Sequence, residues 1–470
     1  MSHLRTLVVA AWGLVTIAGA AAAVPAEPTL GVADATGTVD ATADLQALID
    51  RTPDGGTVHL EEGGNYRVEG TLRLVNRHNL RIEGNGARIF ATTVGHLHRR
   101  HISIVNGSGL VVRNLEIHGA NPYAGLDDRA YVEGLVGQYG VALEGATDVE
   151  LDNLNVHDVY GDFVYVSRNE ARRWTEGVWI HDSTFARSGR QGITVVAGRD
   201  VVIERNTITD ARRASIDLEP NSPSWGAENI HIIDNQIGPG RLLFVAAGGL
   251  GPVNRVVIAR NTLRDHMLNF WVIPPPGDRR KEFWVVDNTG DIDARRPPLQ
   301  FTRVDGVVVA GNTQPVTKLD EALVQATDSC GMMVGENNFG PGTLPLASSG
   351  RPCDFKLPLA PPEPPAVAGR GQEPAAPDVE VTVTPTSPPT TATTTTAAPT
   401  TTATTAPPTS QTPPSTTRLA ASTDARGGDG VAVPVVVLAM VLSAAAGAGA
   451  AVAVTGRRGR RSAARHRQRR

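Results

Sequence analysis

The chain has 470 residues, of which 44 are Lys or Arg and 48 are Asp or Glu, and its formal net charge is −4. Eight of the arginines lie in residues 456–470, so the rest of the chain is more acidic than this total. An acidic chain excludes nucleic acid as the expected partner. Two cysteines are too few for a disulfide-dense scaffold or a cysteine-ligated metal domain.

The first residues have the composition of a secretory signal. Arg5 supplies positive charge, residues 7–20 are apolar, and three alanines at 21–23 offer a cleavage site. Residues 1–23 are therefore predicted to be a cleaved signal peptide. The alternative, an uncleaved membrane anchor, is disfavoured because the apolar run is short for a span.

A short helix is predicted next, as a cap on a stack of strands. Leu45, Leu48 and Ile49 would share its apolar face. Thr42 stands where a side-chain N-cap is expected. Such a helix would cover the open, aggregation-prone end of the stack. Gly55-Gly56 then turns the chain into the first strand.

Six apolar blocks, each closing on asparagine, dominate the middle of the chain. The asparagines recur every 24 to 29 residues, a period typical of solenoids. The blocks are β-branched and bounded by turns, which favours strands. Asparagine amides can bond from coil to coil, so the repeat predicts an internal ladder. Residues 24–358 are therefore expected to form an all-β, right-handed parallel β-helix. The blocks end at Asn206, Asn235, Asn261, Asn288, Asn312 and Asn337, with weaker copies at 149–153 and 178–183.

This pattern resembles the pectin-lyase-like right-handed β-helix superfamily, and the capping segment carries the strongest resemblance. The resemblance implies the fold and, because well-known members cleave polysaccharides, a carbohydrate-related activity. Of the polygalacturonase signatures only an Asp-Asp pair occurs, at 127–128. Residues 179–182 read Trp-Ile-His-Asp, with the two polar residues of the pectate lyase block exchanged. Residues 189–193 and 216–221 resemble bacterial β-helix-repeat proteins more closely.

Carboxylates on the outer face of one predicted strand are the candidates for catalysis. Inward-pointing Ile216 and Leu218 leave the residues beside them facing outward, with Cα atoms roughly 6.5–7 Å apart. Carboxyl groups about 5–9.5 Å apart suit cleavage of a glycosidic bond. Coils stacked about 4.8 Å apart would bring further turn residues to the same edge. The catalytic candidates are Asp158, Asp162, Asp217 and Glu219.

Basic and aromatic residues beside these carboxylates are the candidates for substrate binding. Arginine can hold a uronate or a sulfate through bidentate hydrogen bonds, and one arginine could act as the base of a β-elimination. The alternative is a set of salt bridges that stitch successive coils together. The substrate-binding candidates are His157, Tyr160, His181, Arg187, Arg190 and Arg213.

No metal and no cofactor are predicted. His118 and His157 fall in one column of the stacked coils, with His181 nearby, but none has the tight spacing of a metal site. Calcium stays open as an alternative, through aspartates of the same turns. These aspartates are Asp158, Asp162 and Asp182.

A long insertion, residues 119–139, interrupts the early coils. Loops on a rigid scaffold often carry binding, and Tyr123, Tyr131 and Tyr139 could stack on sugar rings. The alternative is a surface excursion without a function of its own.

The C-terminal part is predicted to hold the β-helix outside the cell. Cys330 and Cys353 are expected to form a disulfide that pins the last coil. Residues 359–430, rich in Pro, Thr and Ala, indicate a disordered stalk. Residues 431–455 are long and apolar enough for one transmembrane helix, and the Arg-rich tail, 456–470, is expected in the cytoplasm. This describes a single-pass type I membrane protein; residues 419–424 resemble a sortase motif without matching it.

Two functions follow from these patterns. The first is a membrane-anchored, carbohydrate-active enzyme, a polysaccharide lyase or glycoside hydrolase acting on an acidic polysaccharide. The second is a non-catalytic surface protein that binds a cell-envelope glycan or acts as an adhesin. The outward carboxylates favour the first, and the missing family signatures favour the second.

Overall fold

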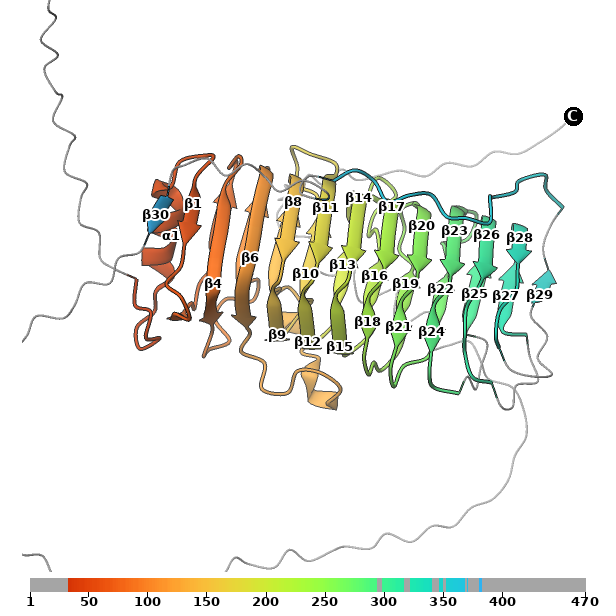
Figure 1. Cartoon of the computed structure of the whole chain (residues 1–470), viewed down its shortest axis with the longest axis horizontal. Helices are drawn as coiled ribbons and strands as arrows, with labels where there is room; N and C mark the ends of the chain where they lie inside the picture. The colour runs from red at the N-terminus through yellow and green to blue at the C-terminus, as the bar shows by residue number, and fades with distance from the viewer. Residues whose placement is uncertain are drawn as a thin grey trace, which may run out of the picture.

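The computed structural model describes residues 33–293, 298–316, 322–339, 346–349, 352–367, 370 and 380–382. Parallel strands stack into a long rod, with the N-terminal coils at one end and β29 at the other (Figure 1). The predicted all-β parallel β-helix with an N-terminal capping helix is confirmed. The expected signal peptide, transmembrane helix and cytoplasmic tail, and most of the expected stalk, lie outside the described residues. No helix within these ranges is long and apolar enough to cross a membrane.

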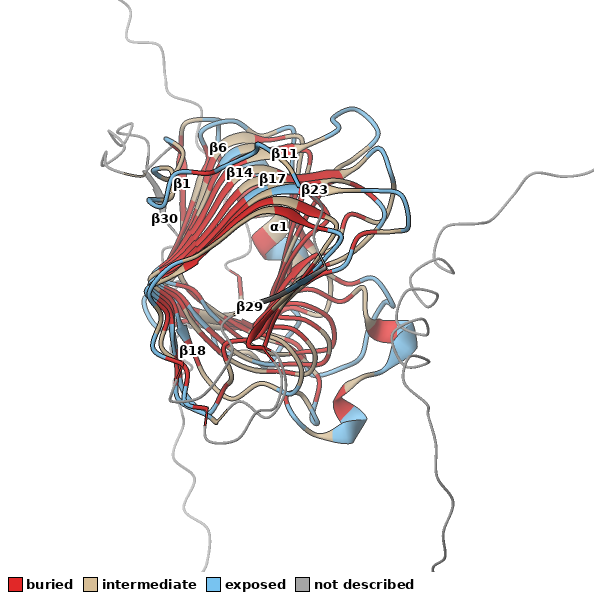
Figure 2. Cartoon of the chain, turned by 90° about the vertical axis from the view of Figure 1, so that its right-hand side faces the viewer, coloured by how far each residue is buried: buried red, intermediate tan, exposed pale blue. Residues whose placement is uncertain are grey.

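Helix α1 (Thr42–Arg51) lies across the far end of the ring of strands when the rod is viewed along its axis (Figure 2). Leu45, Leu48 and Ile49 are buried, as the sequence predicts. The predicted N-cap is wrong, because Ala41 occupies that position and makes no side-chain cap. Thr42 is the first helical residue, and its hydroxyl donates to Asp40 at 2.5 Å. These contacts seal the apolar interior at this end.

Two sheets form the walls of the rod, and every pairing between their strands is parallel. Sheet B has eleven strands and forms one wall. Its strands are β3 (Leu72–Val75), β5 (Ile102–Val105), β7 (Val141–Glu144), β10 (Val164–Ser167), β13 (Ile193–Val195), β16 (Ile216–Leu218), β19 (Val245–Ala247), β22 (Phe270–Val272), β25 (Leu299–Thr302), β27 (Val324–Thr327) and β29 (Leu346–Ser349).

Sheet A has nineteen strands and bends at a corner, so it forms the other two walls. One wall consists of β1 (Thr57–His59), β4 (Arg81–Phe90), β6 (Ser108–His118), β8 (Thr147–Asp152), β11 (Thr175–His181), β14 (Ala197–Glu204), β17 (Gly226–Ile233), β20 (Val253–Ala259), β23 (Arg280–Val286), β26 (Val304–Ala310), β28 (Cys330–Val334) and β30 (Glu380–Thr382). The other consists of β2 (Asn65–Arg67), β9 (Asn155–Val159), β12 (Thr184–Ser188), β15 (Thr207–Ala211), β18 (Gln236–Ile237), β21 (Thr262–Leu263) and β24 (Thr289–Gly290), into which β4 and β6 also extend.

Apolar side chains fill the rod in columns that follow the register. Ile180, Ile203 and Ile232 align on successive coils and are fully buried. Strand alternation explains this, because each inward side chain meets the equivalent residue of the next coil. The predicted inward positions are therefore confirmed; they include Leu151, Ile180, Ile203, Ile232 and Ile258.

The asparagine ladder runs along the corner between the two walls of sheet A. Each side-chain Nδ2 donates to the Oδ1 of the next coil, at 2.9 to 3.1 Å. Each Oδ1 also accepts from the backbone N–H of the preceding asparagine, so little polar capacity of these buried amides is left unused. Upstream, Ser183 takes the ladder position and Leu154 the one before it. The weaker repeat at 149–153 therefore ends one residue before the ladder position. Its Asn153 is exposed and adopts a left-handed turn with φ 47°.

A C-terminal strap, residues 352–367 and 370, runs back along the outer face of sheet A. The predicted disulfide Cys330–Cys353 is present, with Cα atoms 5.8 Å apart, and fixes one end of the strap. Leu357 and Val367 are buried against an apolar stripe on β14 to β26. Residues 359–367, which the sequence places in the stalk, therefore lie on the solenoid. Beyond the strap, β30 pairs with β1 at the opposite end of the rod.

Candidate functional site

Five polar residues gather where the turns after β9, β12 and β15 lead into sheet B. We call Asp162, Arg190, Gln191, Asp217 and Glu219 the acid cluster. Asp217 lies within β16, and Glu219 directly follows it. Their neighbours in the strand are completely buried in the core, so alternation directs both carboxyl groups to the outer face. The predicted orientation of the pair is therefore present in the structure.

Arg190 joins two of the carboxylates from one coil to another. Its Nη1 donates to Asp162 at 2.9 Å, and its Nη2 donates to Glu219 at 3.1 Å. Asp162 has no exposed surface and also accepts from the backbone N–H of Gln191. The side-chain amide of Gln191 donates to Asp217 at 2.5 Å. Arg190 and Gln191 thus donate hydrogen bonds to all three carboxyl groups.

The carboxyl groups of Asp217 and Glu219 act on each other electrostatically. Burial and the neighbouring Glu219 raise the pKa of Asp217 well above its ordinary value, against the effect of Arg190. Burial also raises the pKa of Glu219, and Asp162 adds to this effect. The pair therefore holds a proton at a higher pH than free carboxyl groups do.

A stacked pair of tyrosines borders the acid cluster towards the N-terminal coils. The rings of Tyr139 and Tyr165 are 4.4 Å apart and nearly parallel, at 7°. Burial raises the pKa of Tyr165 to about 12 and raises that of Tyr139 further. Thr194 aligns with both Tyr165 and Asp217, and its buried hydroxyl has no hydrogen-bond partner among the described residues. The outer face of sheet B therefore has an aromatic border, then a hydroxyl, then the carboxyl pair.

The same row continues towards the C-terminal end with small residues and then an aromatic one. Asp217 aligns with Ala246, which aligns with Trp271. With coils about 4.8 Å apart, Tyr165 and Trp271 are separated by roughly 19 Å along the rod. This is long enough for several sugar rings to lie between the two aromatic side chains.

The insertion 119–139 folds over the turns beside the acid cluster, through two short 3-10 helices, η1 (Asp128–Ala130) and η2 (Glu133–Leu135). Asp128 accepts from Arg212 at 3.2 Å and also pairs with Arg241. The three tyrosines of the insertion contact other side chains: Tyr123 packs against Arg129, Tyr131 against Arg213, and Tyr139 stacks on Tyr165. Only Tyr123 of these three is exposed. The insertion thus buttresses the site.

The remaining predicted site residues fall into separate places. Arg187 binds Asp158 in a bidentate pair, with both contacts at 2.7 Å, and lies 3.3 Å from His157. Although burial opposes it, these hydrogen bonds lower the pKa of Asp158. Tyr160 is buried. His181 lies on sheet A, away from the acid cluster. Arg213, beside the cluster, makes no ion pair among the described residues and packs 4.4 Å from the Tyr131 ring.

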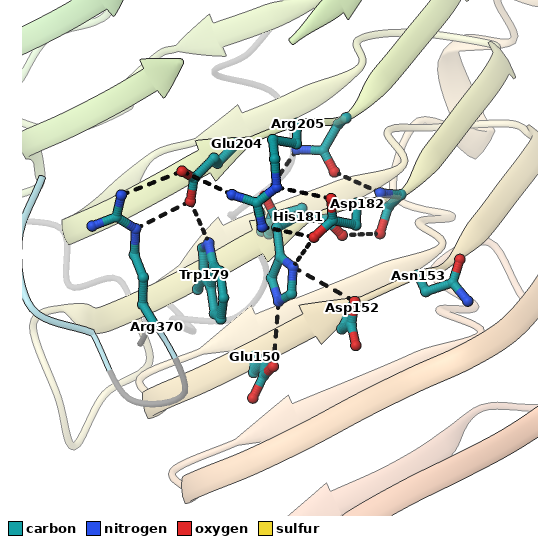
Figure 3. A network of polar contacts seen from close by, with 12 residues as sticks. Glu150, Asp152, Asn153, Trp179, His181, Asp182, Glu204, Arg205 and Arg370 are labelled. Atoms are coloured by element: carbon teal, nitrogen blue, oxygen red, sulfur yellow. Dashed lines mark hydrogen bonds and ion pairs between the residues drawn. The ribbon is translucent and has the colours of Figure 1, made fainter. Parts of the chain in front are cut away.

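His181 belongs to another polar network, on the outer face of β8, β11 and β14 (Figure 3). Its Nδ1 lies 2.7 Å from Asp182, and its Nε2 lies 3.3 Å from Glu150. Trp179 stacks on its ring, with centroids 3.4 Å apart. Sequence reasoning missed Glu150, and also Asp152, Gln191 and Tyr165. These residues could have been found from the strand register, because outward-facing residues at equivalent positions of aligned blocks become neighbours on successive coils.

Comparison with known proteins agrees with the coil geometry. The right handed beta helix region family matches residues 100–292. The fold is a right-handed parallel β-helix, as the resemblance in the sequence implies. No curated protein sequence matches the chain.

Three solved structures illustrate the similarity in fold. The surface protein and adhesin PfbA of Streptococcus pneumoniae is 16% identical with a TM-score of 0.45, covering 68% of this chain and 97% of its own. The endo-xylogalacturonan hydrolase of Aspergillus tubingensis is 14% identical with a TM-score of 0.47, covering 68% and 95%. The Family 28 exopolygalacturonase of Yersinia enterocolitica is 12% identical with a TM-score of 0.48, covering 70% and 78%. At TM-scores below 0.5, none of them decides what this chain does.

Proposed function

We propose that the protein cleaves an acidic polysaccharide on the outer face of sheet B, with Glu219 exchanging protons with the substrate. The neighbouring carboxyl groups of Asp217 and Glu219 on the outer face of β16, both with a raised pKa, carry this proposal. The Glu219 side chain is 21% exposed, whereas Asp217 is only 4% exposed. Glu219 is thus the member that reaches a substrate, and Asp217 positions it. A carboxyl group that titrates closer to neutrality is suited to both accepting and donating a proton.

The burial of one of the two carboxyl groups favours a lyase over a hydrolase. Hydrolases place their two carboxyl groups about 5–9.5 Å apart, across the sugar ring. Here Asp217 is buried, so Glu219 is the one carboxyl group of the pair that faces a substrate. In β-elimination, one such group suffices: Glu219 takes the proton from C5 of a uronate, the C4–C5 bond becomes double, and the glycosidic oxygen leaves C4 with that proton.

Arg213 is the group that we assign to the uronate carboxylate. It lies beside the acid cluster, and its positive charge acts on both Asp217 and Glu219. Arg190 is already committed to Asp162 and Glu219, and Arg187 to Asp158. A guanidinium bound to the substrate carboxylate stabilises the negative charge that develops when the C5 proton is removed.

A second function, glycan binding without catalysis, is favoured by one observation. Arg190 and Gln191 together bind both oxygens of Asp162, one of Asp217 and one of Glu219, so much of the cluster is already a hydrogen-bonded network. Such a network can also act only to hold successive coils together. The aromatic border of Tyr165 and Trp271 would then be the binding surface, because aromatic faces and flanking polar groups suit sugar rings.

We further propose that this face lies outside the cell and is held there by the C-terminal segment. The disulfide Cys330–Cys353 supports an oxidising compartment. The signal peptide at 1–23 and the membrane helix at 431–455 remain predictions from the sequence.

The test is a polysaccharide screen that reads unsaturated-uronate absorbance and new reducing ends together. Absorbance that disappears in Glu219→Gln supports the lyase. The matched control is Glu144→Gln, an outward carboxylate of the same sheet that pairs with Arg100 at 2.9 Å; we expect it to keep full activity. Reducing ends without absorbance would replace the lyase with a hydrolase. Retention of a glycan without cleavage, lost in Trp271→Ala, would establish the binding function instead.

A further inference from the structure

Three potential metal ligands lie together on the outer face of β8 and β11, on a different sheet from the acid cluster. Asp152 of β8 aligns with His181 of β11, and Glu150 lies two residues before Asp152. One ligand atom from each residue lies within 4.8 Å of the other two. We propose that Glu150, Asp152 and His181 form a binding site for a divalent transition metal ion, with Zn²⁺ as the expected occupant. This site is independent of the proposed activity.

The imidazole of His181 is oriented as metal-binding histidines usually are. Its Nδ1 donates to Asp182 at 2.7 Å, and Arg205 donates to the same carboxylate at 2.9 and 2.7 Å. A carboxylate behind the ring fixes the tautomer and makes the other nitrogen more basic. Nε2 is that nitrogen, and it faces Glu150 at 3.3 Å. The network thus presents Nε2 to Glu150, while Oδ1 of Asp152 lies 3.5 Å from Nδ1 at the edge of the same ring (Figure 3).

Packing holds the ring in this orientation. Trp179 stacks on it with an interplanar angle of 18°, and its own Nε1 donates to Glu204 at 2.9 Å. His181 is only 5% exposed, so the ring has little room to turn. A ligand fixed before binding loses little conformational freedom when the ion arrives.

The cluster is short of positive charge. Arg205 is paired with Asp182 and Glu204, and Arg113, which aligns with Asp152, is paired with Glu83, so neither guanidinium forms an ion pair with Glu150 or Asp152 among the described residues. A metal ion would replace the proton on Nε2 and neutralise both carboxylates.

The donor set and the exposure select the kind of ion. One imidazole nitrogen and two carboxylate oxygens match Zn²⁺ with three protein ligands and an open position, rather than Ca²⁺ with its all-oxygen shell. The Asp152 side chain is 24% exposed, which leaves an approach from solvent.

A second cluster, with one carboxylate and two histidines, provides the control. Glu116, His118 and His157 also place ligand atoms within 4.8 Å of one another. There, Arg88 lies 3.1 Å from Glu116 and Arg187 lies 3.3 Å from His157. These guanidinium groups already supply the positive charge and repel a cation. We therefore expect no metal at the second cluster.

The experiment measures zinc per chain in the full-length protein, purified in detergent, stripped with a chelator and dialysed against micromolar Zn²⁺. We expect close to one zinc per chain in the wild type and in His157→Gln, and an affinity at least about tenfold lower in Asp152→Asn and His181→Gln. Co²⁺ in place of zinc should quench the Trp179 emission, and the quenching should vanish in Trp179→Phe.

Zinc that is absent from the wild type, or that persists in both ligand variants, would overturn the proposal. Equal melting temperatures of wild type and variants in chelator show that the variants fold. If His181→Gln unfolds, Asp152→Asn decides alone, because its side chain lies near the surface.

Discussion

Arg370 binds Glu204 across 166 residues of sequence, with Nε 3.1 Å from Oε2. The ion pair fixes the strap to β14, far from the disulfide that fixes its other end. Between these two points the strap covers Trp284, whose Nε1 donates to the carbonyl of Pro358 at 3.0 Å. The strap therefore closes the apolar stripe on the outer face of sheet A.

Removing the ion pair should loosen the strap. We expect Arg370→Ala to lower the free energy of unfolding by about 1 kcal/mol, because Glu204 keeps Trp179 and Arg205 as partners. Hydrogen exchange should rise along residues 357–367 and stay unchanged in β10. Unchanged exchange in the strap would show that its apolar contacts alone hold it.

The same pair predicts a pH dependence. Although burial opposes it, hydrogen bonds from Arg370 and Trp179 lower the pKa of Glu204 below its ordinary value of 4.5. A depressed carboxyl pKa stabilises the fold above pH 4.5, and this stabilisation is lost as the pH falls through the folded-state pKa. Acid titration of wild type against Glu204→Gln should show the loss in the wild type alone. Parallel titration curves would contradict this assignment.

The asparagine ladder should be intolerant of truncation. Asn261 bonds to Asn235 on one coil and to Asn288 on the next. Asn261→Ala leaves the Asn235 amide and the Ile232 carbonyl buried without these partners. We expect a loss of about 3 kcal/mol in denaturant unfolding. Asn155→Ala, an exposed asparagine in β9, is the control and should change stability by less than about 0.5 kcal/mol. Equal effects would show that the ladder does not contribute.

The ladder was predictable from the sequence because its signal is local and repeated. Each asparagine closes a β-branched block at nearly constant spacing, so register follows from the period alone. The weaker repeat at 149–153 indicated the wrong ladder residue for a physical reason. Asn153 is an asparagine in a left-handed turn, and the ladder position beside it is Leu154. Asparagine occurs both in left-handed turns and in the ladder, so the spacing of asparagines cannot distinguish these two roles.

The sites were less predictable, because their partners come from different coils and different surroundings. Alternation alone places Asp217 and Glu219 outward, as predicted. Their hydrogen-bond partners Arg190 and Gln191 come from the preceding coil, and sequence alone does not place them. His181 was predicted to bind substrate, but its neighbour Glu150 emerges only once the register of β8 against β11 is known. The strap escaped prediction because its proline-rich sequence has no strand pattern.

The acid cluster predicts a stability that falls as the pH rises. Because burial and Glu219 raise the pKa of Asp217, the folded chain binds a proton that the unfolded chain releases above its ordinary pKa of 3.8. The stabilisation is complete below that pH and is lost as the pH rises through the folded-state pKa. In Asp217→Asn we expect a smaller loss of stability between about pH 4 and pH 7 than in the wild type. If stability fell equally with pH in both proteins, the raised pKa of Asp217 would be refuted.

The disulfide should stabilise the last coils and the strap more than the rest of the rod. A solenoid coil contacts only its neighbours, so damage at one end stays local. Replacing Cys330 and Cys353 together by serine should cost about 3 kcal/mol for the C-terminal coils. Hydrogen exchange should rise in β26 and β28 and remain slow in β11 and β14. If protection instead fell equally in all four strands, the rod would unfold as one cooperative unit, and the strap would be the element that couples its two ends.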